Sequence, residues 1–486
     1  MEEMQEKEKK LIEKSLVIID YTLESLLQHD YNQSINMYNT LLKAFETLQN
    51  LYSDNSYRHS IFYERLTELE SLHKIVIKKV ENNKFEGLND YIEENIKKSY
   101  EELYLLVNTL HLHKKYGINI QIKQYNSLLS NGYLEDIAEK DINTVQNYWE
   151  NYYGKKVDPI VHIAFKRKTG RLDPRVITQR VLNESVVPYF NFGQEGTFYS
   201  DKNIYDLLIT KDYSPKVILK RVNGQYFDGD NFTISKTKAY RLFSHYKKDI
   251  IIKQSLADDG KAVKKIKYKN YKYMINGSEM TFEKIEKVFG KHFLMQEVIS
   301  QHPIMAKPHP SSVNTFRLIT LRWNNEIHYL CGYGKFGSGN AVIDNDSTSG
   351  GGIAVAISPD GEFKPYGSDG DAKIYYTHPT TGYKFADLGY LPNFDKVIDF
   401  VKNLHNRILH RNYVSWDIAI GKDGEPIFIE MNFRGTVWRV QLICEQPIFG
   451  EFTEDILKTL ADERKRKEKQ EDEKVKLQSE TENIKN

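Results

Sequence analysis

The first part of the chain repeats apolar side chains every three or four positions, which is the spacing of one face of a helix. No proline occurs before Pro159, so long helices are expected. The pattern predicts a helical N-terminal region, residues 1–150, whose apolar stripes form a bundle core or contact a partner protein. These apolar positions are Ile12, Leu16, Ile19, Leu23 and Leu26; Leu41, Phe45 and Leu48; Phe62, Leu66, Leu69, Val76 and Val80; and Tyr91, Ile96, Leu103, Leu106 and Leu110.

From about residue 155 short β-branched runs mix with helical pieces. Strands are predicted for 216–222, 249–255, 314–323, 326–334 and 352–358, and helices for 281–290 and 394–410. The elements interleave without strict alternation, which favours an α+β fold over a doubly wound sheet. The charged tail, 461–486, is predicted to be a solvated helix extension or disordered.

The bulk composition excludes several classes of protein. The 68 basic and 67 acidic side chains nearly cancel, which argues against a partner nucleic acid. Only two cysteines occur, so no disulfide framework is expected and a reducing compartment fits. The charged start is unlike a signal peptide, and no apolar run approaches the ~18 residues of a membrane span. We therefore expect a cytoplasmic protein of two or three domains.

The segment "SWDIAIGKDGEPIFIEMNFRG", residues 415–435, places acids and an amide inside two apolar runs. Asp423-Gly424 predicts a two-residue hairpin turn with positive φ at both positions. Asp417 then lies opposite Glu430, and Ser415 lies opposite Asn432. A four-residue loop would keep these faces, whereas a three-residue loop would not. The other face is expected to be apolar: Trp416, Ile418, Ile420, Ile427, Ile429 and Met431.

Opposed carboxylates on one face of a sheet repel each other. A divalent cation would remove that repulsion, and oxygen ligands without His or Cys favour magnesium over zinc. The alternative is the solvent-facing polar side of an ordinary hairpin.

Four further segments carry candidate chemistry. Lys202 begins a helical stretch, and Lys253 ends a β-branched run before a loop that contains Gly260; lysines in such places can hold phosphates. Gln296 and Glu297 end a strand-like run whose backbone could bind an adenine edge. Arg317 lies within an apolar strand, where an arginine normally has an anionic partner. The alternatives are exposed strand ends and an ordinary loop.

In this order the segments resemble the ATP-grasp fold, and the runs "DPRVITQRVLNESVVPYFN", "SVNTFRLITL", "VIDNDSTSGGG" and "FIEMNFRGTVWRVQ" resemble its sugar-transfer-associated group. The resemblance covers about residues 150–460. It implies an N-terminal ATP-grasp part, 151–300, with the phosphate lysines and the hinge. It also implies a C-terminal part, 301–460, with the magnesium site.

The resemblance assigns roles to single residues. It gives the ATP phosphates to Lys202, Lys253 and the Gly260 loop, and the adenine to Gln296, Glu297 and Val298. It gives the γ-phosphate or acyl phosphate to Arg317, and magnesium to Asp417, Glu430 and Asn432. An acceptor-site loop matches Asn345 and Gly350–Gly352. The sequence departs from the family at Asp258 and Asp259, where many members have glycines, and at the ribose position, where Gln301 or His302 would substitute.

The implied function is an ATP- and magnesium-dependent ligase that joins a carboxylate to an amine through an acyl phosphate, on a cell-envelope or exopolysaccharide precursor. The alternatives are an amino-acid ligase that modifies a peptide or protein, and a nucleotide-binding protein without turnover. The sequence shows no Ser-His-Asp or Cys-His arrangement to propose, and His302, His309 and His378 are interpreted as surface residues or proton carriers.

Overall fold

The computed structural model describes residues 2–51, 61–116, 122–134, 137–193, 196–209, 211–256, 263–339 and 352–485. The chain divides into two compact units, Met1–Leu129 and Ser130–Asn486. We expected the helical region to extend to about residue 150. The chain is helical there, as α7 (Glu139–Tyr153), and the contacts group this helix with the second unit.

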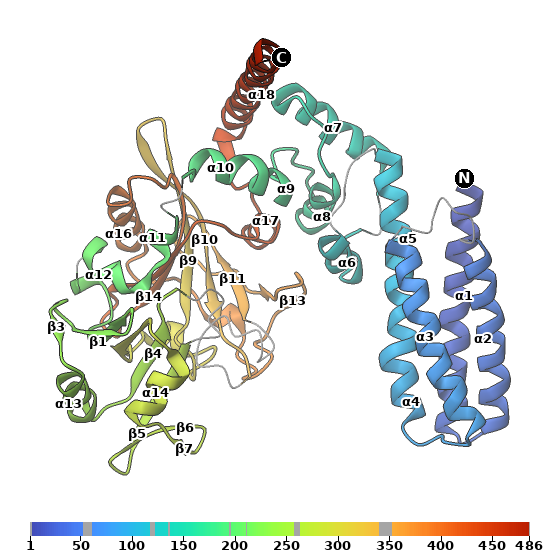
Figure 1. Cartoon of the computed structure of the whole chain (residues 1–486), viewed down its shortest axis with the longest axis horizontal. Helices are drawn as coiled ribbons and strands as arrows, with labels where there is room; N and C mark the ends of the chain where they lie inside the picture. Colours follow the sequence, from blue (N-terminus) through green and yellow to red (C-terminus); the bar gives the residue numbers. More distant parts are fainter. Residues whose placement is uncertain are drawn as a thin grey trace. The chain divides into compact units, whose positions relative to one another are not determined.

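The first unit is built from helices that pack side by side (Figure 1). Its core includes residues from each of the predicted stripes: Ile12, Ile19, Leu41, Phe62 and Ile96 are almost completely buried. The helical prediction for this region is confirmed. The helices are α1 (Glu2–Leu27), α2 (Tyr31–Leu51), α3 (Ile61–Glu81), α4 (Leu88–Tyr91), the π-helix η2 (Ile92–Lys97), α5 (Lys98–Tyr116) and α6 (Ile122–Ser130).

The second unit contains two antiparallel sheets, so the predicted α+β class is confirmed. The first sheet has the order β3-β2-β1-β8-β4-β5-β6-β7. Helices α13 (Lys236–Tyr246) and α14 (Phe282–Phe289) supply Phe243, Phe282 and Ile285 to its core. Its strands are β1 (Val217–Val222), β2 (Gln225–Asp228), β3 (Thr233–Ile234), β4 (Ile250–Gln254), β5 (Val263–Lys269), β6 (Lys272–Ile275), β7 (Ser278–Glu279) and β8 (Phe293–Glu297).

The second sheet has the order β13-β12-β11-β10-β9-β14-β15 and a core on each face. Helix α16 (Phe394–Asn406) packs on one face, and α17 (Val437–Cys444), α18 (Thr453–Lys485) and α7 contribute to the core on the other. Its strands are β9 (Thr315–Trp323), β10 (Glu326–Phe336), β11 (Ile353–Ile357), β12 (Gly367–Ser368), β13 (Ile374–Tyr375), β14 (Tyr413–Ile420) and β15 (Pro426–Asn432).

Short helical segments connect these elements. They are α8 (Ile160–Thr169), α9 (Gln179–Val181), the π-helix η3 (Leu182–Val186), α10 (Val187–Phe190), α11 (Gly196–Ser200), η4 (Lys202–Ile204), α12 (Tyr205–Leu208), η5 (Lys211–Tyr213), α15 (Pro303–Ala306), η7 (Phe385–Asp387) and η8 (Gly450–Phe452). The charged tail forms the end of α18, in line with the predicted helix extension. Every helix in the described part of the chain is too short or too polar to cross a bilayer.

Side-chain alternation determines where polar groups can gather on the second sheet. On β14, Trp416 and Ile418 point to the core that contains α16, so Ser415 and Asp417 point to the opposite face. Arg317 on β9 pairs across from Asp417 and shares that face. The sheet thus brings residues from distant segments into one polar cluster.

Candidate functional site

The β14–β15 hairpin has the predicted partners, with Asp417 opposite Glu430 and Ser415 opposite Asn432. The predicted two-residue turn is wrong. The N–H of Gly421 donates to the carbonyl of Glu425 at 2.8 Å, which leaves a three-residue loop. Of the two predicted turn residues, Asp423 and Gly424, only Gly424 has a positive φ, of 84°. Glycine adopts this conformation readily because it has no Cβ.

A β-bulge restores the register that this loop would otherwise shift. Ile418 pairs with Phe428 while Asp417 pairs with Glu430, so Ile429 has no partner across the ladder. Phe428 therefore enters the core, where it is 1% exposed, and Ile429 is only half-buried. This corrects the predicted apolar face at Ile427 and Ile429.

Asp417 lies at the centre of a cationic cluster. Its carboxylate accepts two hydrogen bonds from Arg317, at 2.6 and 2.8 Å, and one from Lys335 at 3.1 Å. The amide of Asn432 lies 3.4 Å from the same carboxylate. Burial alone would raise the pKa of Asp417, but Arg317 and Lys335 lower it to about 2. Asp417 is therefore ionised at neutral pH.

Glu430 has its own cation. Its Oε1 lies 2.9 Å from the Nζ of Lys202, whose side chain is 5% exposed. Protein cations thus balance both carboxylates, so the charge repulsion that we expected from this pair is already relieved.

The second predicted lysine lies beside the first. Burial and the nearby Lys202 lower the pKa of Lys253 to about 8, although Glu430 acts to raise it. The backbone N–H of Lys202 donates to the carbonyl of Ser255, two residues beyond Lys253, at 3.0 Å. The structure thus brings together Lys202 of η4 (Lys202–Ile204), Lys253 of the first sheet and Glu430 of the second sheet.

A small cavity of about 10 Å³ lies among these groups. It is lined by Lys202, Lys253 and Gln296, and from the second sheet by Phe428 and Ile429. Gln296 donates its side-chain amide to the carbonyl of Pro215 at 3.2 Å. The N–H of Glu297 donates to the carbonyl of Lys216, just before β1, at 3.0 Å. Val298 follows the end of β8.

A larger cavity of about 190 Å³ lies on the face that carries Arg317 and Lys335. Helix α17 borders it with Val437, Arg439 and Val440. Tyr333, Tyr413 and Ser415 line it from the strands, and the predicted acceptor-loop residue Gly352 also lies at its wall.

The donor set at the hairpin fits magnesium in kind, because carboxylate and amide oxygens are its usual protein ligands. The described residues contain no group of three or more His, Cys, Asp or Glu able to hold a metal, so the predicted set rests on two carboxylates and one carboxamide. Within the described parts of the chain, Glu430 Oε2 has no hydrogen-bond partner.

Several predicted residues are placed elsewhere or lie outside the description. Gly260, Asp258, Asp259, Asn345, Gly350 and Gly351 lie outside the described residues. Gln301 binds the backbone of Ser312 and Asn314, and His302 caps α15, so local structure uses both of the proposed ribose ligands.

The histidines were interpreted in part as surface residues, and for two of them this is wrong. His309 and His378 are 2% and 1% exposed. Their rings stack with centroids 5.4 Å apart, and His378 Nε2 bonds the carbonyl of Gly337 at 2.7 Å.

Sequence reasoning missed Lys335 and Lys220. The only local signal for Lys335 is a charge at the end of the apolar run "YLCGYGKFG". Lys220 in "KVILKRV" has the pattern of an exposed strand lysine, yet it is 2% exposed.

The family described as sugar-transfer associated ATP-grasp matches residues 182–456. A comparison with curated proteins found no match. Among solved structures, the ATP-grasp ligase PsnB in complex with precursor peptide PsnA2 and AMPPNP is 13% identical, with a TM-score of 0.32. The match covers 56% of this chain and 62% of PsnB. A further PsnB structure contains Mg and ADP.

Two other ligases show a similar degree of likeness. An L-amino acid ligase from Bacillus licheniformis is 12% identical over 54% of this chain and 48% of its own, with a TM-score of 0.29. D-alanyl-alanine synthetase A from Vibrio cholerae O1 is 11% identical over 56% and 67%, with a TM-score of 0.29.

Proposed function

Because the chain belongs to the sugar-transfer associated ATP-grasp family, we propose that it is an ATP- and magnesium-dependent ligase. The proposed reaction joins a carboxylate to an amine by way of an acyl phosphate. Bound magnesium would supply charge neutralisation on the transferring phosphoryl group. The residues of the chain would supply positioning and further positive charge.

The observation that carries this proposal is the contact of Lys202 with Glu430 beside the buried Lys253. A nucleotide phosphate could replace Glu430 as the counterion of both lysines. The cavity between them holds about 10 Å³, close to the space of one water molecule. Phosphate binding at this position would therefore require Lys202 and Glu430 to separate.

We propose the remaining roles from the resemblance to the family. Gln296, Glu297 and Val298 would bind the adenine at the end of β8. Arg317 and Lys335 would bind the acyl phosphate, while Asp417, Glu430 and Asn432 would hold magnesium. The cavity of about 190 Å³ under α17 adjoins Arg317 and Lys335, and the carboxylate substrate would enter there.

The description of the family supports a substrate in sugar metabolism. We propose a carboxylate or amine on a cell-envelope or exopolysaccharide precursor. An acidic sugar, such as a uronic acid, is the first donor to test because it offers a carboxylate on a sugar ring.

The test measures ATP binding and turnover separately. We expect ATP to raise the melting temperature only slightly alone and clearly with magnesium. We also expect ADP release when hydroxylamine and a uronic acid are added, and loss of that release in Lys253→Met. No thermal response to ATP and magnesium would refute the nucleotide site. Binding without ADP release from any sugar acid would instead favour a nucleotide-binding protein without turnover.

A further inference from the structure

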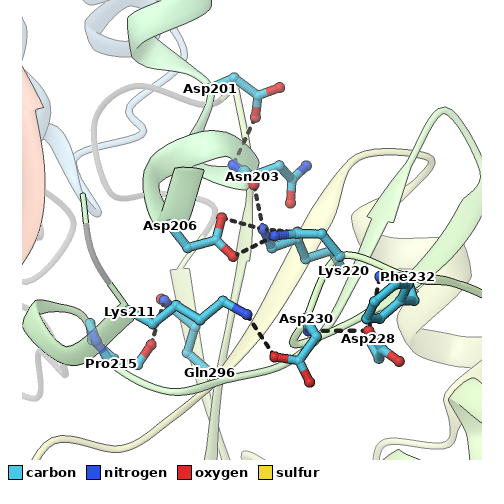
Figure 2. Close-up of polar contacts among 11 residues, drawn as sticks. Asp201, Asn203, Asp206, Lys211, Pro215, Lys220, Asp228, Asp230, Phe232 and Gln296 are labelled. Atoms are coloured by element: carbon cyan, nitrogen blue, oxygen red, sulfur yellow. Dashed lines mark hydrogen bonds and ion pairs between the residues drawn. The ribbon is translucent and has the colours of Figure 1, made fainter. Parts of the chain in front are cut away.

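Lys220 on β1 is a buried lysine in which every ammonium hydrogen has an acceptor. Its Nζ donates to the carbonyl of Asn203 at 2.6 Å, to Asp206 Oδ1 at 2.6 Å and to Asn231 Oδ1 at 2.7 Å. Figure 2 shows the ammonium of Lys220 turned toward Asn203 and Asp206. A lysine has three donors, so these bonds satisfy the group completely.

The partner carboxylate is equally enclosed. The side chains of Lys220 and Asp206 are 3% and 4% exposed. The amide of Asn231 donates to Asp206 Oδ2 at 3.1 Å, so both oxygens of the carboxylate are bonded. We call Lys220, Asp206 and Asn231, together with the carbonyl of Asn203, the Lys220 clamp.

The clamp joins segments that are otherwise separate elements. Asn203 lies in η4 and Asp206 in α12, the two short helices that begin at Lys202. Asn231 lies in the turn between β2 and β3. Lys220 thus fastens the segment that carries Lys202 to the first sheet. Its two contacts on that segment, Asn203 and Asp206, lie one and four residues after Lys202.

Lys202 itself extends from this fastened segment toward the second sheet. Its Nζ is 2.9 Å from Glu430. Asp206 and Lys202 also line the same small cavity. A shift of η4 and α12 would therefore move the Lys202 ammonium relative to Glu430 and Lys253.

The buried Lys220–Asp206 pair is not needed for stability alone. A buried ion pair costs desolvation energy, and apolar residues of the same volume are often as good or better. Hydrogen bonds are directional, unlike apolar packing. Three short hydrogen bonds therefore restrict the position of the segment more tightly than dispersion contacts do.

We propose that Lys220 and Asp206 are positioning residues that hold the Lys202 ammonium in place for an ATP phosphate. The inference rests on the proposed function, since Lys202 must bind ATP for its position to matter. Neither residue is assigned a contact with ATP or a role in the chemical step.

The test is a double-variant cycle on ATP affinity, measured by calorimetry with magnesium present on the full chain. Lys202→Met and Lys220→Met are each expected to weaken ATP binding by about tenfold or more. If Lys220 acts through Lys202, the double variant binds ATP no more weakly than Lys202→Met alone. Additive losses, or normal ATP affinity in Lys220→Met, would overturn the proposal.

Loss of fold must be separated from loss of position. Lys220→Met leaves the Asp206 carboxylate buried without its cation, so the melting temperature should fall. Lys220→Met with Asp206→Leu removes both charges and should recover much of that stability. ATP affinity should stay low in this variant. Recovery of ATP affinity together with stability would show that the pair is only structural.

Lys211→Met is the matched control. Lys211 contacts Asp230 in the same β2–β3 turn at 2.7 Å (Figure 2). Both of these side chains are exposed. We expect less than about a twofold change in ATP affinity, because exposed pairs contribute little. An equal loss in Lys211→Met and Lys220→Met would count against a specific clamp.

The cycle also separates this inference from the proposed function. If Lys202→Met binds ATP normally, the proposed phosphate site itself is wrong. If Lys202→Met loses affinity and Lys220→Met does not, only the clamp is wrong.

Discussion

Glu430 holds the ammonium of Lys202, and this contact changes what its removal should do. If Glu430 only faced Asp417, neutralising Glu430 would relieve the repulsion between the two carboxylates. The structure pairs each carboxylate with a cation, so little repulsion remains to relieve.

We expect Glu430→Gln to lower the free energy of unfolding, without ATP or metal, on the order of 1–3 kcal/mol, because the buried Lys202 loses its counterion. ATP turnover should fall by orders of magnitude if Glu430 holds magnesium. Chemical denaturation and ADP release would measure the two effects. Full turnover in Glu430→Gln would end the magnesium assignment, whatever its stability.

Lys253 provides a pH test at the same scale. Its pKa of about 8 in the folded chain lies below the 10.5 of an unperturbed lysine. Between these values the unfolded chain binds more protons, so the free energy of unfolding rises as pH rises through this window. ATP phosphates favour the protonated amine, so ATP affinity should fall over the same window.

Proton uptake would report this linkage directly. At pH 8.5, ATP binding is expected to take up protons, which calorimetry detects by comparing buffers with different ionisation enthalpies. Lys253→Met removes the group and should reduce that uptake. Unchanged uptake in the variant would assign the proton to another residue.

At the scale of elements, the bulge in β15 separates a structural role from a binding role in adjacent residues. Phe428 is 1% exposed in the core, whereas Ile429 is half-buried. Both line the small cavity beside Lys253. A simple alternation of the hairpin would have placed them the other way round.

Phe428→Ala should therefore cost about 3–5 kcal/mol of unfolding free energy, as large core truncations do. Ile429→Ala should cost less stability but weaken ATP binding, because its side chain faces the proposed nucleotide cavity. Denaturant unfolding and ATP calorimetry on both variants check the pair. Greater destabilisation by Ile429→Ala would contradict the bulged register.

At the scale of the whole molecule, each of the two units has its own hydrophobic core. The second core includes Val145, Trp149 and Tyr153 of α7. Trp149 also donates to the carbonyl of Pro174 at 2.9 Å. The segment between Ser130 and Lys155 thus contributes to the unit that carries the candidate site.

A chain that begins at Ser130 should fold and bind ATP, whereas one that begins at Lys155 should be markedly less stable. The shorter chain loses Trp149, and loss of a buried tryptophan side chain costs about 3–5 kcal/mol. Thermal unfolding by circular dichroism compares the two chains, with Trp149→Ala in the full chain as the control. Equal melting temperatures for both truncated chains would place the boundary near residue 155 after all.

Local sequence pattern determined the helices of the first unit, the main strands and the facing pairs of the hairpin. These elements bury every second, third or fourth side chain, so their apolar spacing is visible in the sequence. Ile12, Ile19 and Trp416 are predicted core positions that are completely buried. The hairpin partners were predicted correctly even though the turn was not, because the bulge at Ile429 offset the longer loop. The longer loop and the bulge each shift the pairing by one residue, and the two shifts cancel.

Only the tertiary structure decided which cation balances which carboxylate. Arg317 and Asp417 are 100 residues apart. Lys220 has the sequence pattern of an exposed strand residue, yet it is buried against Asp206. Such contacts join single residues from different segments of the chain, so the periodicity of the sequence does not predict them. The sequence alone determined the residue types that are available for phosphate and metal binding. Folding determined their charge balance, and with it the chemistry that they can perform.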